Sequence, residues 1–249
     1  MRGSLVRMGV AAVLLCSARA VAAQETAKGP TSWLSANVAL TSDYVFRGIS
    51  QTQGEPAIQG GIDVKHPSGL YAGTWGSSVN FGEGLEGGRR AEMELDVYGG
   101  LARSLAGLVD FDVGALYYAY PGAAGSRGYD YWELGTGLSR DVGPLSAGVA
   151  VKYSPDFFGG AGRAVDYAAQ LEVPVSVVTL TGSLGQQRIE RNDVAGTPDY
   201  AHWSVGAAVS WSGFQLTGQY VGTSLRRAEC FGGTGLCRGR AVVGVSRAM

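Results

Sequence analysis

The stretch AHWSVGAAVSW, residues 201–211, alternates between apolar and polar or small side chains at almost every step. Trp203, Val205 and Trp211 share one side of an extended chain, whereas His202 and Ser204 share the other. Successive side chains of a β-strand point to opposite faces. A period of two therefore predicts a strand with one apolar and one polar face.

The same alternation recurs along the rest of the chain. No stretch after the N-terminal segment has the 3.6-residue period of an amphipathic helix, so the sequence predicts an all-β protein. About twelve segments alternate, at roughly 33–46, 55–65, 69–81, 91–102, 107–120, 129–140, 144–153, 163–173, 175–187, 200–211, 213–224 and 239–249.

The connections between these segments alternate in length. Short turns are expected at 66–68, 103–106, 141–143, Pro174 and 212–213, and longer loops at 47–54, 82–90, 121–128, 154–162, 188–199 and 225–238. Short periplasmic turns and longer external loops are typical of outer-membrane barrels. Residues 33–249 are therefore expected to form a transmembrane antiparallel up-and-down β-barrel of about 12 strands.

The composition agrees with this class. Of 249 residues 40 are glycine, 45% are hydrophobic and 16% are charged, with a formal net charge of −1. The apolar share argues against a disordered chain. A pI near 6.1 argues against a nucleic-acid-binding protein.

Residues 1–23 resemble a secretory signal, and residues 24–32 form a short segment before the barrel. Arg2 and Arg7 precede an apolar stretch at 9–15, and the small residues 21–23 precede Gln24, with 18–20 as an alternative cleavage site. The apolar run is too short to span a bilayer. The expected location is the bacterial outer membrane.

Two cysteines, Cys230 and Cys237, flank a glycine-rich segment. An exported chain meets an oxidising compartment, so a local disulfide is the first interpretation. Free thiols are the alternative. A zinc site lacks further ligands nearby.

The polar faces carry more charge than a soluble core can bury without partners, whereas a water-filled lumen accommodates it. The candidate pore-lining bases are Arg47, Lys65 and Lys152. The candidate acids are Asp63, Glu92, Glu94, Asp96, Asp110, Asp112, Glu133, Asp166 and Glu172. The excess of acids predicts a cation-preferring channel. Because no loop looks long enough to form a large plug, a narrow open channel is expected.

Two loop segments allow more than one interpretation. Arg47 and Asp43 could form an ion pair or constriction in the lumen, or belong to a rim turn in which Gly48 supplies backbone freedom. Phe157 and Phe158 could dip into lipid or contact a partner, although loop geometry alone explains the neighbouring proline and glycines.

Aromatic residues suggest two membrane girdles. Trp203 and Trp211 lie eight residues apart on one face, about 26 Å along a strand. That span, tilted, approximates the apolar band of outer-membrane barrels. Further candidates are Trp33, Tyr44, Phe46, Tyr71, Phe81, Phe214 and Tyr220.

No catalytic motif, cofactor site or metal site is recognisable. His202 with Ser204 or Ser210 could suggest a lipid hydrolase, but no orienting acid is identifiable. The expected function is passive diffusion of small cationic or neutral solutes. The alternatives are a barrel enzyme acting on lipids and a structural or adhesion barrel with a closed lumen. The expected partners are outer-membrane lipid, the barrel-assembly machinery and small solutes, with no nucleic acid and the oligomeric state open.

A family resemblance supports the channel interpretation. The segment TSDYVFRGISQTQGEPAIQGGIDVKHPSGLYAGTWGSSVNF, residues 41–81, resembles the N-terminal signature of the TorF-type porin family of Gram-negative outer membranes. Similar stretches are ELDVYGG (94–100), YYAYPG (117–122), YDYWELGTGLS (129–139) and VKYSPDFFGG (151–160). The resemblance implies an outer-membrane barrel and brings no substrate or site residue. One departure is the C-terminus, which ends at Met249 where such barrels usually end in an aromatic residue; Arg247 falls in the lipid-facing register.

Overall fold

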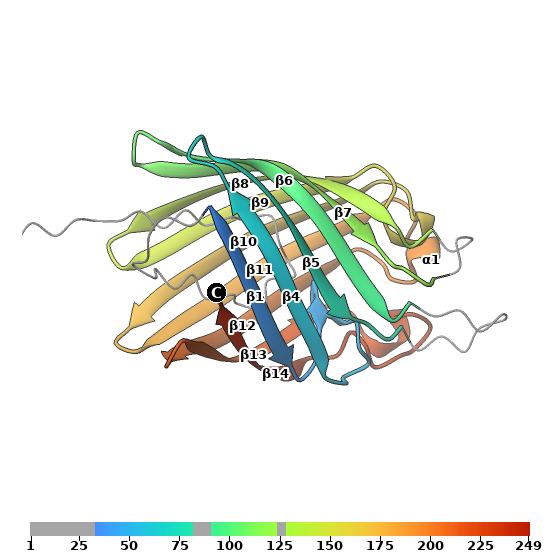
Figure 1. Ribbon diagram of the computed structural model, residues 1–249. Helices are drawn as coiled ribbons and strands as arrows, with labels where there is room; N and C mark the ends of the chain where they lie inside the picture. Colours follow the sequence, from blue (N-terminus) through green and yellow to red (C-terminus); the bar gives the residue numbers. More distant parts are fainter. Residues whose placement is uncertain (1–32, 82–90, 124–127) are drawn as a thin grey trace, which may run out of the picture.

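The computed structural model describes residues 33–81, 91–123 and 128–249. Twelve antiparallel strands close into one barrel, in which sequence neighbours pair and β1 closes on β14 (Figure 1). The predicted 12-stranded up-and-down barrel is confirmed. The predicted signal at 1–23 and the segment 24–32 lie outside the described residues.

The barrel strands fall close to the alternating segments of the sequence. They are β1 (Leu34–Thr41), β4 (Ala57–Lys65), β5 (Leu70–Ser78), β6 (Met93–Leu105), β7 (Val109–Ala119), β8 (Tyr131–Val142), β9 (Leu145–Ser154), β10 (Ala164–Val175), β11 (Val178–Ile189), β12 (Tyr200–Trp211), β13 (Phe214–Thr223) and β14 (Arg240–Ala248). The loops carry η2 (Phe158–Gly160), α1 (Asn192–Ala195) and η3 (Arg227–Glu229). The strands β2 (Val45–Phe46) and β3 (Ile49–Ser50) form a separate two-stranded sheet.

Short turns gather at one end of the barrel and long loops at the other (Figure 1). We call them the turn end and the loop end. The turns use positive φ angles, as at Ser212 and Gly213 (52° and 78°). The turn predicted at Pro174 is wrong: Pro174 lies inside β10, and the chain reverses two residues later, where Ser176 adopts a φ of 59°.

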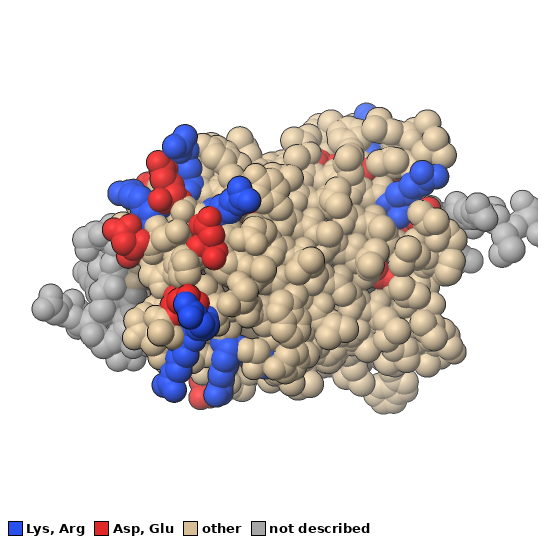
Figure 2. Space-filling model, turned by 180° about the vertical axis from the view of Figure 1, so that it is seen from behind, with Lys and Arg blue, Asp and Glu red and all other residues tan. Residues whose placement is uncertain are grey.

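The outer face of the barrel is apolar. Figure 2 shows charged side chains towards the two ends of one face and a band of other residues between them. The alternation therefore points its apolar set outwards, as expected when lipid rather than a protein core covers the sheet. Exposed outward residues include Leu34, Val38, Leu40, Ile58, Ile62, Val97, Leu134, Leu138, Val149, Leu171, Leu180, Leu184, Val205, Leu216 and Val243.

Aromatic residues border this band. Trp33, Trp211 and Phe214 are exposed near the turn end, and the guanidinium carbon of Arg247 lies 5.1 Å from the Phe214 ring centre. Trp203 is exposed towards the loop end. Others on that side are Tyr117, Trp132, Tyr153, Tyr167 and Tyr220.

Four residues proposed for the girdles instead point inwards. Tyr71 has the same register as the buried Trp75 and lies on the inner face of β5. Tyr44, Phe46 and Phe81 follow the ends of β1 and β5, where the chain leaves the barrel wall and packs inside its mouth.

Candidate functional site

The inner wall of the barrel is lined by charged side chains. The predicted lumen residues that lie there and are buried are Asp63, Glu94, Asp96, Asp112, Glu133, Lys152 and Asp166. Asp110 shares the register of Asp112 and is half-buried. Lys65 and Glu172 keep the inward register but are exposed at the turn end.

Glu92 is a correction to the predicted set. It precedes β6, which begins at Met93, and its side chain is exposed at the loop end. It therefore lies at the rim. Glu92 continues the register of Glu94 and Asp96, but at this point the chain has not yet joined the sheet.

A hairpin fills the loop end of the lumen. Residues 42–56 form an excursion between β1 and β4, whose last pair is Thr41 with Ala57. We call this segment the lumen hairpin. Its strands β2 and β3 are joined by Arg47 and Gly48, both at positive φ (46° and 80°), as a type I′ turn requires.

The side chain of Arg47, at the tip of the lumen hairpin, reaches the far wall. Arg47 donates to Glu133 on β8 through one nitrogen at 2.7 and 2.9 Å, and to Gln187 on β11 at 2.7 Å. Its Nε lies 3.6 Å from Asp166 on β10. Both interpretations of Arg47 therefore apply, because it occupies a turn and also forms ion pairs in the lumen. Its partners are Glu133 and Asp166 rather than Asp43.

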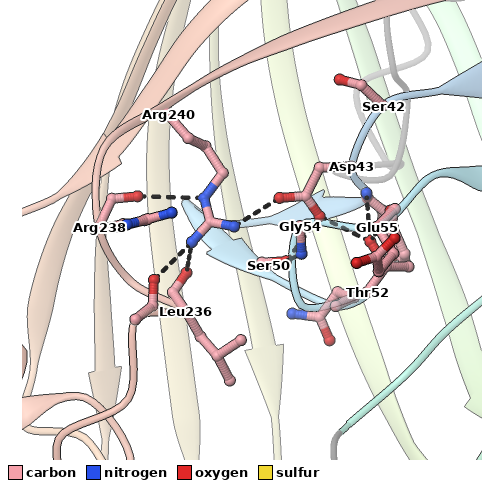
Figure 3. Close-up of polar contacts among 12 residues, drawn as sticks. Ser42, Asp43, Ser50, Thr52, Gly54, Glu55, Leu236, Arg238 and Arg240 are labelled. Carbon is pink, nitrogen blue, oxygen red and sulfur yellow. Dashed lines mark hydrogen bonds and ion pairs between the residues drawn. The ribbon is translucent and has the colours of Figure 1, made fainter.

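The base of the lumen hairpin is held by Asp43 (Figure 3). Its carboxylate accepts hydrogen bonds from Ser50 and Thr52, each at 2.7 Å, and pairs with Arg240 of β14 at 2.7 Å. Arg240 also donates to the carbonyl of Leu236, at 2.7 Å. A buried carboxylate with three partners is well satisfied, so the base is firmly placed.

Aromatic packing closes the same end of the barrel. Tyr44 lies edge-on to Trp75, with ring centres 5.5 Å apart, and its hydroxyl donates to Glu94 at 2.8 Å. Phe158 stacks on Tyr129 at 4.5 Å, within a cluster that also holds Phe81 and Tyr120. Neither lipid contact nor a partner is needed to explain the Phe157–Phe158 pair, because both rings pack inside the mouth.

Although no loop is long enough to form a large plug, these contacts show that a short segment fills the loop end of the lumen. The lumen hairpin is short, but it turns inwards. The inner-face residues around it are buried, among them Glu94 and Gln187. One sequence signal could have revealed that this segment turns inwards. The alternation stops at Tyr44, Val45 and Phe46, three large side chains in succession that cannot all face lipid or all face water.

The disulfide is present and contacts the lumen hairpin. Cys230 and Cys237 are bonded to each other, as predicted. Both pack with Ile49 of β3 in a small buried cluster, and the Ser50 backbone N–H donates to the carbonyl of Leu236 at 3.0 Å. The stapled loop therefore supports one side of the hairpin.

The histidine of β12 acquires an acid that the sequence did not reveal. His202 Nε2 lies 2.7 Å from Asp166, which comes from β10. The hydroxyl of Ser204, however, is hydrogen-bonded to the hydroxyl of Ser183, at 2.7 Å. Among the described residues, the barrel therefore assembles an acid–histidine pair, whereas Ser204 bonds to Ser183.

The loop end carries surface ion pairs outside the strands. Arg163 donates to both carboxylate oxygens of Glu190, at 3.1 and 3.2 Å. These side-chain hydrogen bonds, with another from the Arg163 backbone, lower the pKa of Glu190 to about 2. Within residues 33–81, 91–123 and 128–249 no helix is long and apolar enough to cross a bilayer, and no cluster of three or more His, Cys, Asp or Glu is arranged to hold a metal ion.

Comparison with known proteins gives a family and a fold. The family described as "Bacterial protein of unknown function (Gcw_chp)" matches residues 24–245. A search of curated proteins finds no match. The KdgM porin is similar in structure, with a TM-score of 0.57 and 8% identity over 86% of this chain and 98% of that chain. The NanC porin is similar with a TM-score of 0.56 and 13% identity over the same shares, 86% and 98%. At these identities the likeness is one of fold, and the TorF-type assignment stays a prediction.

Proposed function

The chain belongs to the Gcw_chp family of bacterial proteins of unknown function, and from its barrel we propose that it is an outer-membrane channel of the porin type for small solutes. The observation that carries this proposal is the division of the barrel into two faces. Apolar side chains cover the outside, and charged side chains line the inside of a closed sheet. Closure satisfies every strand edge, which lipid requires.

The partners follow from the same two faces. The apolar band contacts outer-membrane lipid, and the barrel-assembly machinery inserts the chain after export. Solutes meet the charged inner wall. Twelve strands lie between small filled barrels and wide porins, so the channel admits small solutes only.

Cation preference remains part of the proposal. Glu94, Asp96 and Asp112 lie on adjacent strands β6 and β7, all facing inwards. Arg47 and Lys152 offset part of this charge without removing the excess of acids along the inner wall. A negative wall in a narrow pore concentrates cations, most strongly at low salt.

The test is conductance of the purified protein in a planar bilayer. We expect discrete current steps and a reversal potential on the cation side in a KCl gradient. Changing Glu94, Asp96 and Asp112 to their amides should move that potential towards zero, whereas Glu92→Gln, the rim control, should leave it in place. Anion preference would overturn the selectivity, and a folded barrel without current would overturn the channel.

A structural barrel with a closed lumen is the second candidate, because the loop end is filled by the lumen hairpin and the acids around it are buried. It predicts the absence of current in every variant that folds.

A further inference from the structure

The lumen hairpin is built as an addition to a complete barrel. The pairing of β1 with β4 runs from Leu34 with Val64 to Thr41 with Ala57, so the wall closes without the excursion between them. β2 and β3 pair only with each other. The hairpin can therefore change position without opening a strand edge.

The base and the tip of the hairpin are attached differently. At the base, backbone N–H groups bind neighbouring elements: Ser42 donates to Val243 at 2.8 Å, and Ser50 donates to Leu236 at 3.0 Å. At the tip, the side chain of Arg47 attaches the hairpin to the far wall. Its partners stand on β8, β10 and β11; β8 and β10 flank β9, which lies across the closed strand order from β1.

One buried group would gain from withdrawal of the tip. Asp96, beside Glu94 on the inner face, is fully buried, and both its carboxylate oxygens lack a hydrogen-bond partner among the described residues. Water entering an opened lumen would solvate that carboxylate, and this gain opposes the Arg47 ion pairs.

We propose that the lumen hairpin is the gate of the channel, closed when Arg47 binds Glu133 and Asp166 and open when the tip swings from the far wall about its base. The gate rests on the proposed channel function, since it regulates passage through the same lumen. The base, with Asp43 bound to Arg240 and Ser50 bound to the Leu236 carbonyl, is the fixed end of this movement.

The decisive variant shortens the hairpin. Residues 46–49 are replaced by two glycines. Because Val45 and Ser50 are paired in register, a two-residue turn joins them, and Ser50 keeps its bonds to Asp43 and to the Leu236 carbonyl. The second variant, Arg47→Met, removes the contacts to the far wall and keeps the chain length. The matched control is Arg163→Ala, which breaks an exposed ion pair at the loop end.

All four proteins are refolded, checked for a heat-dependent shift on gels, and compared as single channels in planar bilayers. The shortened variant should show a several-fold larger and steadier conductance than the wild type, and Arg47→Met should open more often, with Arg163→Ala unchanged. Equal conductance in wild type and shortened variant would overturn the gate while leaving the channel standing. Absence of current from every folded protein would overturn the channel, and the gate with it.

Discussion

At the scale of single residues, Gly48 at the turn of the lumen hairpin lies very close to β13. A Cβ built on this glycine would lie 2.5 Å from the Thr223 methyl and 2.7 Å from the Gly222 carbonyl oxygen, both on β13. The backbone φ of 80° also disfavours any other residue. Steric contact and backbone conformation therefore both require glycine at the hairpin tip.

This site allows the two effects to be separated. Gly48→Ala should lower the free energy of unfolding by about 1–3 kcal/mol beyond the conformational cost, because the added methyl overpacks the contact with β13. The control is Gly143→Ala, at a turn with φ of 63° and no atom within 4 Å of the built Cβ, which tests conformation alone. Denaturant titration of the folded band on gels measures both, and equal losses would mean that the tip does not rest on β13.

The buried ion pairs of Arg47 deserve a different interpretation from those at the surface. Burying Glu133 and Asp166 beside one guanidinium gains little net stability, because desolvation offsets the attraction. Their effect is one of position: they define where the hairpin tip rests, whereas the exposed Arg163–Glu190 pair contributes little to structure.

At the scale of elements, the loop 224–239 combines a disulfide with contacts to β3. Its closed ring is short, so the bond contributes about 2 kcal/mol, all of it local. The barrel strands β13 and β14 on either side are held by their own backbone pairing. The loop and the wall should therefore respond differently to reduction.

We expect reduction to leave the heat-dependent gel shift of the barrel unchanged and to speed hydrogen exchange in residues 224–239 and at Ile49 and Ser50. The double variant Cys230→Ser/Cys237→Ser should exchange equally fast with and without reductant, which controls for side effects of the reagent. Loss of the folded band on reduction would contradict this. Two alkylatable thiols in the unreduced protein would mean that the bond does not form.

At the scale of the whole molecule, the two faces of the barrel can be tested at one depth. Leu180 points outwards and pairs in register with Ala207, midway between Trp203 and Trp211. Its neighbour Thr179 points inwards. These two positions lie at similar depth on opposite faces of the same strand.

Leu180→Arg should lower the stability of the folded barrel in lipid vesicles by about 2–4 kcal/mol, because a charge near the bilayer midplane is poorly solvated. Thr179→Arg, on the lumen side, should cost much less and should reduce any cation preference. Reversible denaturant unfolding in vesicles measures the difference. Similar losses in the two variants would contradict the assignment of the outer face to lipid.

The sequence by itself determined the class of fold. Period-two alternation decides which side chains face outwards, and the alternating lengths of turns and loops decide the order of neighbours; both are local properties of the chain. That is why the strands, the closed up-and-down barrel and the inward register of acids such as Glu94 and Asp112 could be predicted. The disulfide was predictable for the same reason, since Cys230 and Cys237 are close in sequence.

Only the tertiary structure decided what fills the lumen. The partners of Arg47 come from β8, β10 and β11, and the acid of His202 comes from β10, so these contacts join residues far apart in the chain. Alternation specifies a face but says nothing about a segment that leaves the sheet, and residues 42–56 could equally have turned outwards. Their direction depends on whether the enclosed wall offers partners for a buried guanidinium, which exists only once the barrel has closed.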